Sequence, residues 1–176
     1  MPTENESDPF DIMEAHVKAL GARVPDLPQS EILLCRLLMH LGREANAMLQ
    51  QQIRPFGLAE AEFRVLMTLF AETEGIAHPS DLCLRASQSP ANMSRICDAL
   101  VARELITRVH SEHDRRRMVL RITLKGEDLV RSLLPNLCVP LKQMLSGFSA
   151  QQQLDLIAQL KRLAQSVPIA LAGPTP

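Results

Sequence analysis

Two groups of polar side chains in this sequence have the residue types that bind nucleic acids. The first is the run Asp114-Arg115-Arg116-Arg117, in which three consecutive guanidinium groups follow a carboxylate. Arginine forms charge-assisted and often bidentate hydrogen bonds to phosphate and to guanine, and Ser and Asn can contact bases or phosphates. The second group precedes the first along the chain and comprises Ser89, Asn92, Ser94 and Arg95. Together the two groups indicate contact with double-stranded DNA.

The second group belongs to a predicted helix with Ser89 as its N-cap and Pro90 as its first residue. Apolar residues recur at three- and four-residue steps and must face the core: Met93, Ile96, Cys97, Leu100 and Val101. The opposite face is small and polar. Because DNA would repel Asp98 on that face, we expect this carboxylate to form an ion pair that orients an arginine.

The neighbouring segments predict a winged helix. A short helix over residues 81–85 precedes the turn at residues 86–88, which makes a helix-turn-helix. Residues 105–110 and 118–124 alternate as two strands, with the polar stretch 111–117 as the tip of a hairpin. In the second strand, one side is predicted to hold Met118, Leu120, Ile122 and Leu124. The connector 75–78 could add a third short strand.

Apolar spacing predicts further helices over residues 11–24, 30–54, 60–72, 127–148 and 150–167, and residues 1–10 are expected to be disordered. Pro135 and Pro140 should kink or divide their helix. Ser149 and Gln152 form a predicted capping box. Several of these helices have more apolar surface than one core-facing stripe needs, which predicts a second copy of the chain as partner.

Composition agrees with a folded domain that carries a local basic patch. The chain of 176 residues is 46% apolar, with a formal net charge of −1. The segment from Arg103 to Lys125 has seven basic and three acidic residues. The absence of Tyr and Trp argues against stacking platforms for single-stranded nucleic acid.

The remaining reactive residue types do not form a recognisable catalytic or metal motif. The four cysteines are widely spread, and we interpret Cys35 and Cys138 as buried packing residues, with thiol sensing as the alternative. His110 and His113 lack the further ligands of a metal site. We therefore expect no enzyme activity, no metal and no cofactor. Without a signal peptide or a long apolar run, we expect a soluble cytoplasmic protein with no membrane partner.

The segment from Pro79 to Gly126 resembles the winged-helix core of the MarR family of bacterial transcription regulators. The family's wing motif appears here as Asp114-Arg115-Arg116 followed by the run from Ile122 to Gly126. The segment 31–70 is similar to the EmrR-like multidrug efflux repressor branch. The sequence departs from the family pattern at three positions: Ala59 replaces a capping Thr or Ser, Glu104 replaces a helix-ending Gly, and Cys83 replaces an Ala.

The resemblance implies a homodimeric repressor on a pseudo-palindromic operator, released by a small amphipathic or phenolic ligand. It also implies that Arg116 enters the minor groove, that Arg115 and Arg117 meet phosphates, and that Asp114 holds Arg116 in place. Met39, Phe63 and Met67 are candidates for the hydrophobic effector pocket, with plain core packing as the alternative.

The expected fold is mainly α: a winged helix-turn-helix with a two- to three-stranded β wing, plus a helical dimerisation layer from the N- and C-terminal helices. Residues 11–176 would form one domain. Within it, residues 57–126 are the DNA-binding region, and residues 11–56 and 127–168 are the dimerisation helices. Two alternatives remain open: a regulator switched by thiol oxidation, and a dimeric winged-helix interaction module without specific DNA binding.

Overall fold

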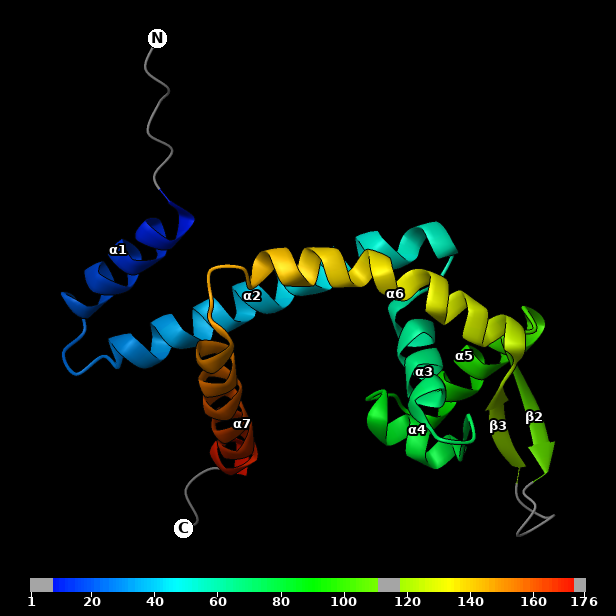
Figure 1. Cartoon of the computed structure of the whole chain (residues 1–176). Coiled ribbons are helices and arrows are strands. Elements are labelled where there is room, and N and C mark those ends of the chain that lie inside the picture. The colour runs from blue at the N-terminus through cyan, green and yellow to red at the C-terminus, as the bar shows by residue number, and fades with distance from the viewer. Residues whose placement is uncertain (1–7, 111–117, 173–176) are drawn as a thin grey trace. The chain divides into compact units, whose positions relative to one another are not determined.

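The computed structural model describes residues 8–110 and 118–172 (Figure 1). These residues form seven α-helices, one short 3-10 helix and three strands. The helices are α1 (Pro9–Gly21), α2 (Gln29–Ile53), η1 (Arg54–Phe56), α3 (Glu60–Ala71), α4 (Pro79–Arg85), α5 (Pro90–Ala102), α6 (Leu124–Met144) and α7 (Ala150–Ala172). The strands are β1 (Ile76–Ala77), β2 (Ile106–His110) and β3 (Met118–Ile122). The chain divides into two compact units, residues 1–51 and 52–176.

The first unit contains α1 and nearly all of α2. Asp8 caps α1 by accepting a hydrogen bond of 2.9 Å from the Phe10 backbone N–H, and Pro9 occupies the first turn. The helix therefore begins within the segment 1–10, and the predicted disorder is wrong for Pro9 and Phe10. Val17 is the buried residue of α1, and the Phe10 ring meets the His40 ring edge-on with 5.4 Å between centroids. These contacts join α1 to α2.

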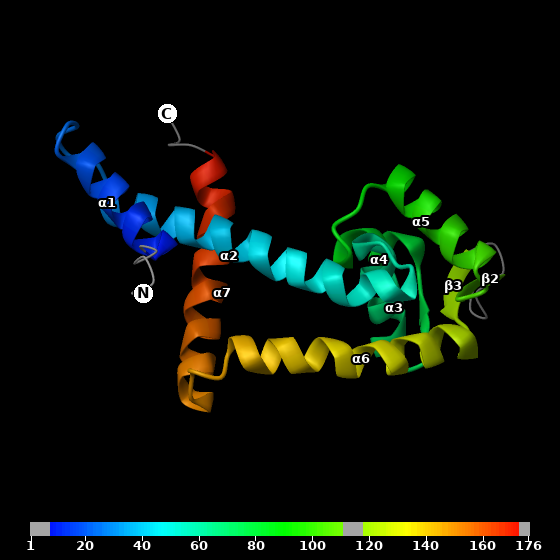
Figure 2. The same cartoon turned by 90° about the horizontal axis from the view of Figure 1, so that it is seen from above.

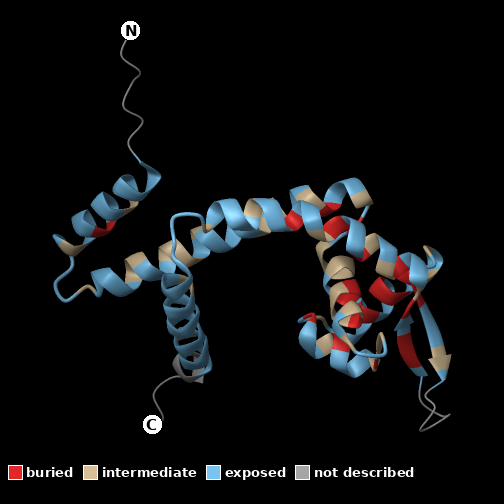
Figure 3. Ribbon diagram, viewed as in Figure 1, coloured by how far each residue is buried: buried red, intermediate tan, exposed pale blue. Residues whose placement is uncertain are grey.

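The second unit is built around a three-stranded antiparallel sheet in the order β1-β3-β2. Ile76 pairs with Arg121, and β2 pairs with β3 from Ile106–Ile122 to His110–Met118. Figure 2 shows α3, α4, α5 and the sheet from above. Figure 3 shows that buried residues gather on these elements and on the first part of α6, whereas the described part of α7 is almost entirely exposed. This packing confirms the predicted winged helix and its third strand.

The second strand of the hairpin does not follow the predicted alternation. Val119 and Leu120 are both buried, and because successive side chains point to opposite faces, β3 is covered on both sides. Met118 is 41% exposed. The sequence pattern places Leu124 in this strand, but Leu124 is the first residue of α6 and 78% exposed.

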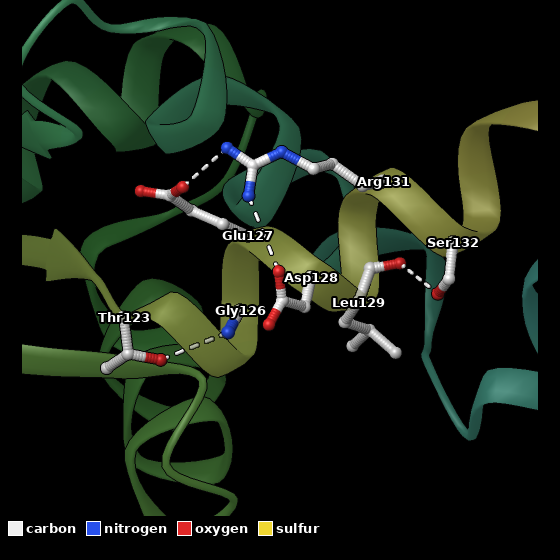
Figure 4. Close-up of polar contacts among 7 residues, drawn as sticks. All are labelled: Thr123, Gly126, Glu127, Asp128, Leu129, Arg131 and Ser132. Carbon is white, nitrogen blue, oxygen red and sulfur yellow. Dashed lines mark hydrogen bonds and ion pairs between the residues drawn. The ribbon is translucent and has the colours of Figure 1, made fainter.

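The start of α6 explains why the strand ends before Leu124. The Thr123 hydroxyl accepts a hydrogen bond of 3.0 Å from the Gly126 backbone N–H, which makes Thr123 an N-cap (Figure 4). One turn later, Arg131 pairs with Glu127 at 2.7 Å and with Asp128 at 3.4 Å. The helix predicted over residues 127–148 therefore begins three residues earlier, at Leu124.

Neither Pro135 nor Pro140 divides α6, which continues as one element to Met144. An interior proline removes its own N–H donor and crowds the carbonyl four residues earlier, yet the helix continues through both positions. Of the predicted kink or division of α6, the division is wrong and the kink stays a prediction. The capping box before α7 is confirmed, since Ser149 N–H donates to the Gln152 side chain at 2.8 Å and Gln152 N–H donates to Ser149 Oγ at 3.3 Å.

At the start of α3, only one of the two hydrogen bonds of a capping box can form. The Glu62 carboxylate accepts a hydrogen bond of 2.9 Å from the Ala59 N–H, although Ala59 has no hydroxyl to accept a bond in return.

None of the helices within residues 8–110 and 118–172 combines the length and hydropathy that a membrane span requires.

Candidate nucleic-acid interface

The helix α5 is anchored as the sequence predicts. The Ser89 hydroxyl accepts a hydrogen bond of 3.3 Å from the Asn92 N–H, and Pro90 is the first helical residue. The inner face is buried through Met93, Ile96, Cys97 and Leu100, while Val101 is half-buried. Burial of this stripe fixes which face of α5 remains outside.

The outer face of α5 is exposed and polar. It brings together the predicted contact residues Ser89, Asn92, Ser94 and Arg95, all exposed. Arg95 makes no hydrogen bond or ion pair with any residue that the structure describes. An exposed guanidinium group on this face can bind a phosphate or a guanine edge.

Asn92 differs from Arg95 because its side chain is already engaged. Its amide nitrogen donates to the Gln88 side-chain oxygen at 2.5 Å, and Gln88 in turn donates to the Ala86 carbonyl at 3.2 Å. The turn of the helix-turn-helix thus holds the Asn92 amide at the start of α5.

Asp98 forms the predicted ion pair, and its partner is Arg108 on β2. The Arg108 guanidinium lies 2.5 Å from the Asp98 carboxylate. Arg108 is not among the residues predicted from the sequence, although an arginine in a short strand next to the recognition helix is a usable signal. The pair links the outer face of α5 to the wing.

The C-terminal end of α5 is held by Arg103. Its guanidinium donates to the Gly57 carbonyl at 2.7 Å and to the Phe56 carbonyl at 2.9 Å, and lies 3.8 Å from the Glu62 carboxylate. Gly57 itself has the left-handed φ of 64° that glycine favours. This fork fixes α5 to the segment that enters α3.

The next residue, Glu104, also has a left-handed backbone, with φ of 60°. This conformation explains why a glycine would suit the position. Its carboxylate pairs with Lys125 at 2.9 Å, and the hydrogen bond and positive charge of Lys125 hold the pKa of Glu104 below its ordinary value.

The predicted wing contacts Asp114, Arg115, Arg116 and Arg117 lie outside the described residues, and so does His113. The strands β2 and β3 pair as far as His110 and Met118, which lie on either side of the segment 111–117. Those four side chains remain predictions.

The candidate effector residues are described in separate units. Met39 is 67% exposed on α2, and Phe63 and Met67 are half-buried on α3. Their role in a ligand pocket remains a prediction.

Across the described chain, His, Cys, Asp and Glu side chains do not gather in groups of three or more that could hold a metal ion.

The prediction of burial is wrong for Cys35 and Cys138, which are both exposed in the single chain. They lie on faces of α2 and α6 that their own unit leaves uncovered. The buried thiol is Cys97, and Cys83 is half-buried.

The helix-turn-helix α4–α5, joined to a hairpin and presenting an exposed polar helix face, defines a winged-helix protein of the DNA-binding class. Residues 56–117 match the sequence profile of the MarR family. The chain is 33% identical to the transcriptional repressor MprA of Escherichia coli K12 over 153 residues, which cover 87% of this chain and 86% of the relative. The chain therefore belongs to the MarR family of transcription regulators.

Solved structures confirm the fold. AbsC, a MarR family transcriptional regulator from Streptomyces coelicolor, matches with a TM-score of 0.74 and 21% identity, covering 82% of this chain and 99% of AbsC. A mutant of MarR from Escherichia coli complexed with operator DNA matches with a TM-score of 0.67 and 21% identity, covering 78% of this chain and 98% of that one.

Proposed function

We propose that this protein is a homodimeric transcriptional repressor that binds a pseudo-palindromic operator in double-stranded DNA. The observation that carries the proposal is the exposed polar face of α5, which presents the side chains of Ser89, Asn92, Ser94 and Arg95. The major groove is wide enough for such a helix. Similarity to the repressor MprA along 87% of the chain supports the same role.

In this proposal α5 reads the major groove. Arg95 binds a guanine edge or a phosphate, and Asn92 contributes its amide to a neighbouring base. Ser89 and Ser94 donate to phosphates. The wing supplies the second contact: Arg116 enters the minor groove, Arg115 and Arg117 meet phosphates, and Asp114 braces Arg116.

A dimer accounts for the apolar side chains that the single chain leaves exposed on α6, α7 and the turn between them. These are Val139, Leu141, Met144, Phe148, Leu154, Leu156, Ile157, Leu160 and Val167. A second copy would remove this surface from water, which is the dominant favourable contribution to most protein association. Two recognition helices would then enter successive major grooves, with half-sites about 10 bp apart.

We further propose that the repressed genes encode a multidrug efflux system and that a small amphipathic or phenolic ligand releases the operator. The resemblance to the efflux-regulator branch supports both parts, and Met39, Phe63 and Met67 are the candidate ligand contacts. A regulator of this kind acts without enzyme chemistry in the cytoplasm, where bacterial DNA lies.

The test is fluorescence anisotropy with labelled DNA from upstream of the chain's own gene and with random DNA, across a salt series. Arg116→Ala should weaken binding to both DNAs. It should also lower the slope of log K against log salt concentration by about one. The matched control is Arg64→Ala, because Arg64 is exposed but already paired with Glu60 at 2.7 Å. Identical binding by wild type and Arg116→Ala would overturn the wing assignment.

Arg95→Ala and Asn92→Ala test the readout by α5. Each should relax sequence preference in a binding-site selection, at a cost of about 1–3 kcal/mol on the preferred site. Release by phenols and hydrophobic drugs is measured in the same anisotropy assay. If no DNA binds in a salt-dependent way, the chain is instead an interaction module.

A further inference from the structure

The turn of the helix-turn-helix carries a glutamine, Gln88, that the proposed DNA contacts do not include. Gln88 lies between α4 and α5, directly before the Ser89 cap. Its backbone N–H donates to the Cys83 carbonyl at 2.9 Å, and the residue is half-buried. The backbone of Gln88 is therefore fixed to α4, on the side from which α5 begins.

Both ends of the Gln88 side-chain amide are engaged. Its nitrogen donates to the Ala86 carbonyl at 3.2 Å, and its oxygen accepts a hydrogen bond of 2.5 Å from the Asn92 side-chain nitrogen. Ala86 is only 1% exposed, and its own N–H donates to the Leu82 carbonyl at 2.8 Å. A chain of hydrogen bonds thus runs from the carbonyl of a buried residue to the Asn92 amide on the exposed face of α5.

The Ala86 carbonyl sets the direction of this chain. A carbonyl oxygen only accepts hydrogen bonds, so the Gln88 amide must turn its nitrogen towards Ala86 and its oxygen towards Asn92. For the same reason Asn92 must offer its nitrogen, and not its oxygen, to Gln88. Rotation of either amide by 180° would bring two acceptors face to face.

The bond to Gln88 uses one of the two N–H groups of the Asn92 amide, which leaves the other N–H and the carbonyl oxygen for a base. In the major groove adenine presents one acceptor and one donor, and an Asn amide can bind both at once. Guanine presents two acceptors there, which a single N–H cannot satisfy. The groups that Asn92 retains therefore match adenine.

We propose that Gln88 is a positioning residue that orients Asn92 to read adenine in each operator half-site. Gln88 acts through Asn92 in this role and makes no contact with DNA. The terminal torsion of an unrestrained Asn side chain is broad, so fixing the amide before DNA binds lowers the entropy lost on binding. This inference rests on the proposed function, whereas the hydrogen bond itself does not.

The hydrogen bond is tested on the free full-length protein by NMR relaxation of the side-chain amides, with the Asn92 signal assigned by its absence in Asn92→Ala. The amide of Asn92 should be ordered in the wild type. Gln88→Met keeps the length of the side chain but removes both of its hydrogen bonds. It should lower the Asn92 order parameter to below about 0.6, the range of flexible groups.

The matched control for this substitution is Gln151→Met. The Gln151 side chain also bonds to a side chain four residues away, since it donates to Asp155 at 2.9 Å, but it lies on α7. Its loss should leave the Asn92 order parameter and every base preference unchanged. Circular dichroism melting verifies that each variant folds.

The role in readout is tested by fluorescence anisotropy on the DNA that the wild type selects, with each base pair of a half-site changed in turn. Asn92→Ala should abolish a preference for adenine at one position, which a bidentate pair sets at about 5- to 150-fold. Gln88→Met should reduce the preference at that position by about 2- to 10-fold, the effect of immobilising one side chain. Binding to random DNA should stay unchanged, whereas a role in folding alone would weaken binding to every sequence alike.

The double variant determines whether Gln88 acts through Asn92. In the Asn92→Ala background, Gln88→Met should have no further effect on base preference, because the group that it orients is already absent. A further loss of the same size would show that Gln88 contacts DNA itself and would overturn the positioning role. An Asn92 amide that stays ordered in Gln88→Met, or a base other than adenine at the Asn92 position, would also overturn it.

The two proposals fail in different ways. If the wild type shows no salt-dependent DNA binding, the proposed function is wrong and the readout by Asn92 is wrong with it. If the wild type selects a DNA sequence and Gln88→Met keeps the full preference at every position, only the role of Gln88 is wrong.

Discussion

The Arg108 guanidinium on β2 lies 2.5 Å from the Asp98 carboxylate on α5 and ties the recognition helix to the wing. Both side chains are well exposed, at 44% and 60%, so the pair stabilises the fold only weakly. Its main effect is to place a carboxylate on the proposed DNA surface and to engage a guanidinium that could otherwise meet a phosphate.

Asp98→Asn should therefore strengthen binding to random DNA. The substitution removes a charge that repels DNA and releases Arg108. The slope of log K against log salt concentration should therefore become steeper by about one. The free energy of unfolding should change by less than about 1 kcal/mol. Anisotropy across a salt series and urea denaturation measure the two effects. Weaker binding by Asp98→Asn would show that the pair is needed to orient Arg108.

Arg103 should matter more to stability than the Asp98 pair. Its fork satisfies the Phe56 and Gly57 carbonyls together, so Arg103→Ala should cost about 1–2 kcal/mol in urea denaturation. Arg103→Lys keeps the charge but lacks the planar fork, and should recover at most about half of that loss. Full recovery by lysine would mean that charge rather than the fork holds α5.

Gly126 and Gly42 give opposite expectations for the same change to alanine. A methyl group at Gly126 would overlap with the Leu105 carbonyl oxygen, so Gly126→Ala should destabilise by about 1–3 kcal/mol. Gly42 lies within α2 with open space around it, so Gly42→Ala should stabilise by about 0.5–1 kcal/mol. Chemical denaturation compares the free energies of unfolding of the two variants directly. An unchanged free energy in Gly126→Ala would contradict the close approach of Gly126 to the Leu105 carbonyl oxygen.

Glu104→Gly should raise the melting temperature, because glycine adopts the left-handed backbone without strain. The pKa of Glu104 is lowered in the folded state, so its pair with Lys125 stabilises above the unfolded pKa and is lost as pH falls through the folded pKa. The advantage of glycine should therefore be larger at about pH 3 than at about pH 7.

Glu104→Gln serves as the control for this pH effect. It keeps a side chain in the strained conformation but removes the charge, so its melting temperature should approach that of the wild type at acid pH. An advantage of Glu104→Gly that is equal at both pH values would mean that the Lys125 pair contributes nothing measurable.

The sequence alone determined the features that depend on neighbours along the chain. The caps at Ser89 and Ser149 and the buried stripe of α5 involve residues within a few positions of each other, so the residue pattern specifies them. The existence of the hairpin and of an ion pair at Asp98 could also be predicted. Two local features differ from the sequence prediction: Asp8 caps α1, and Thr123 ends the strand before Leu124.

The tertiary structure decided which distant groups meet. The partner of Asp98, the carbonyls held by Arg103 and the burial of Val119 on the second face of β3 all join segments far apart in sequence. Periodicity specifies which face of a helix or strand is apolar, but not which element covers it. That choice depends on how the sheet, α4 and α5 pack together, and packing emerges only when the whole unit folds.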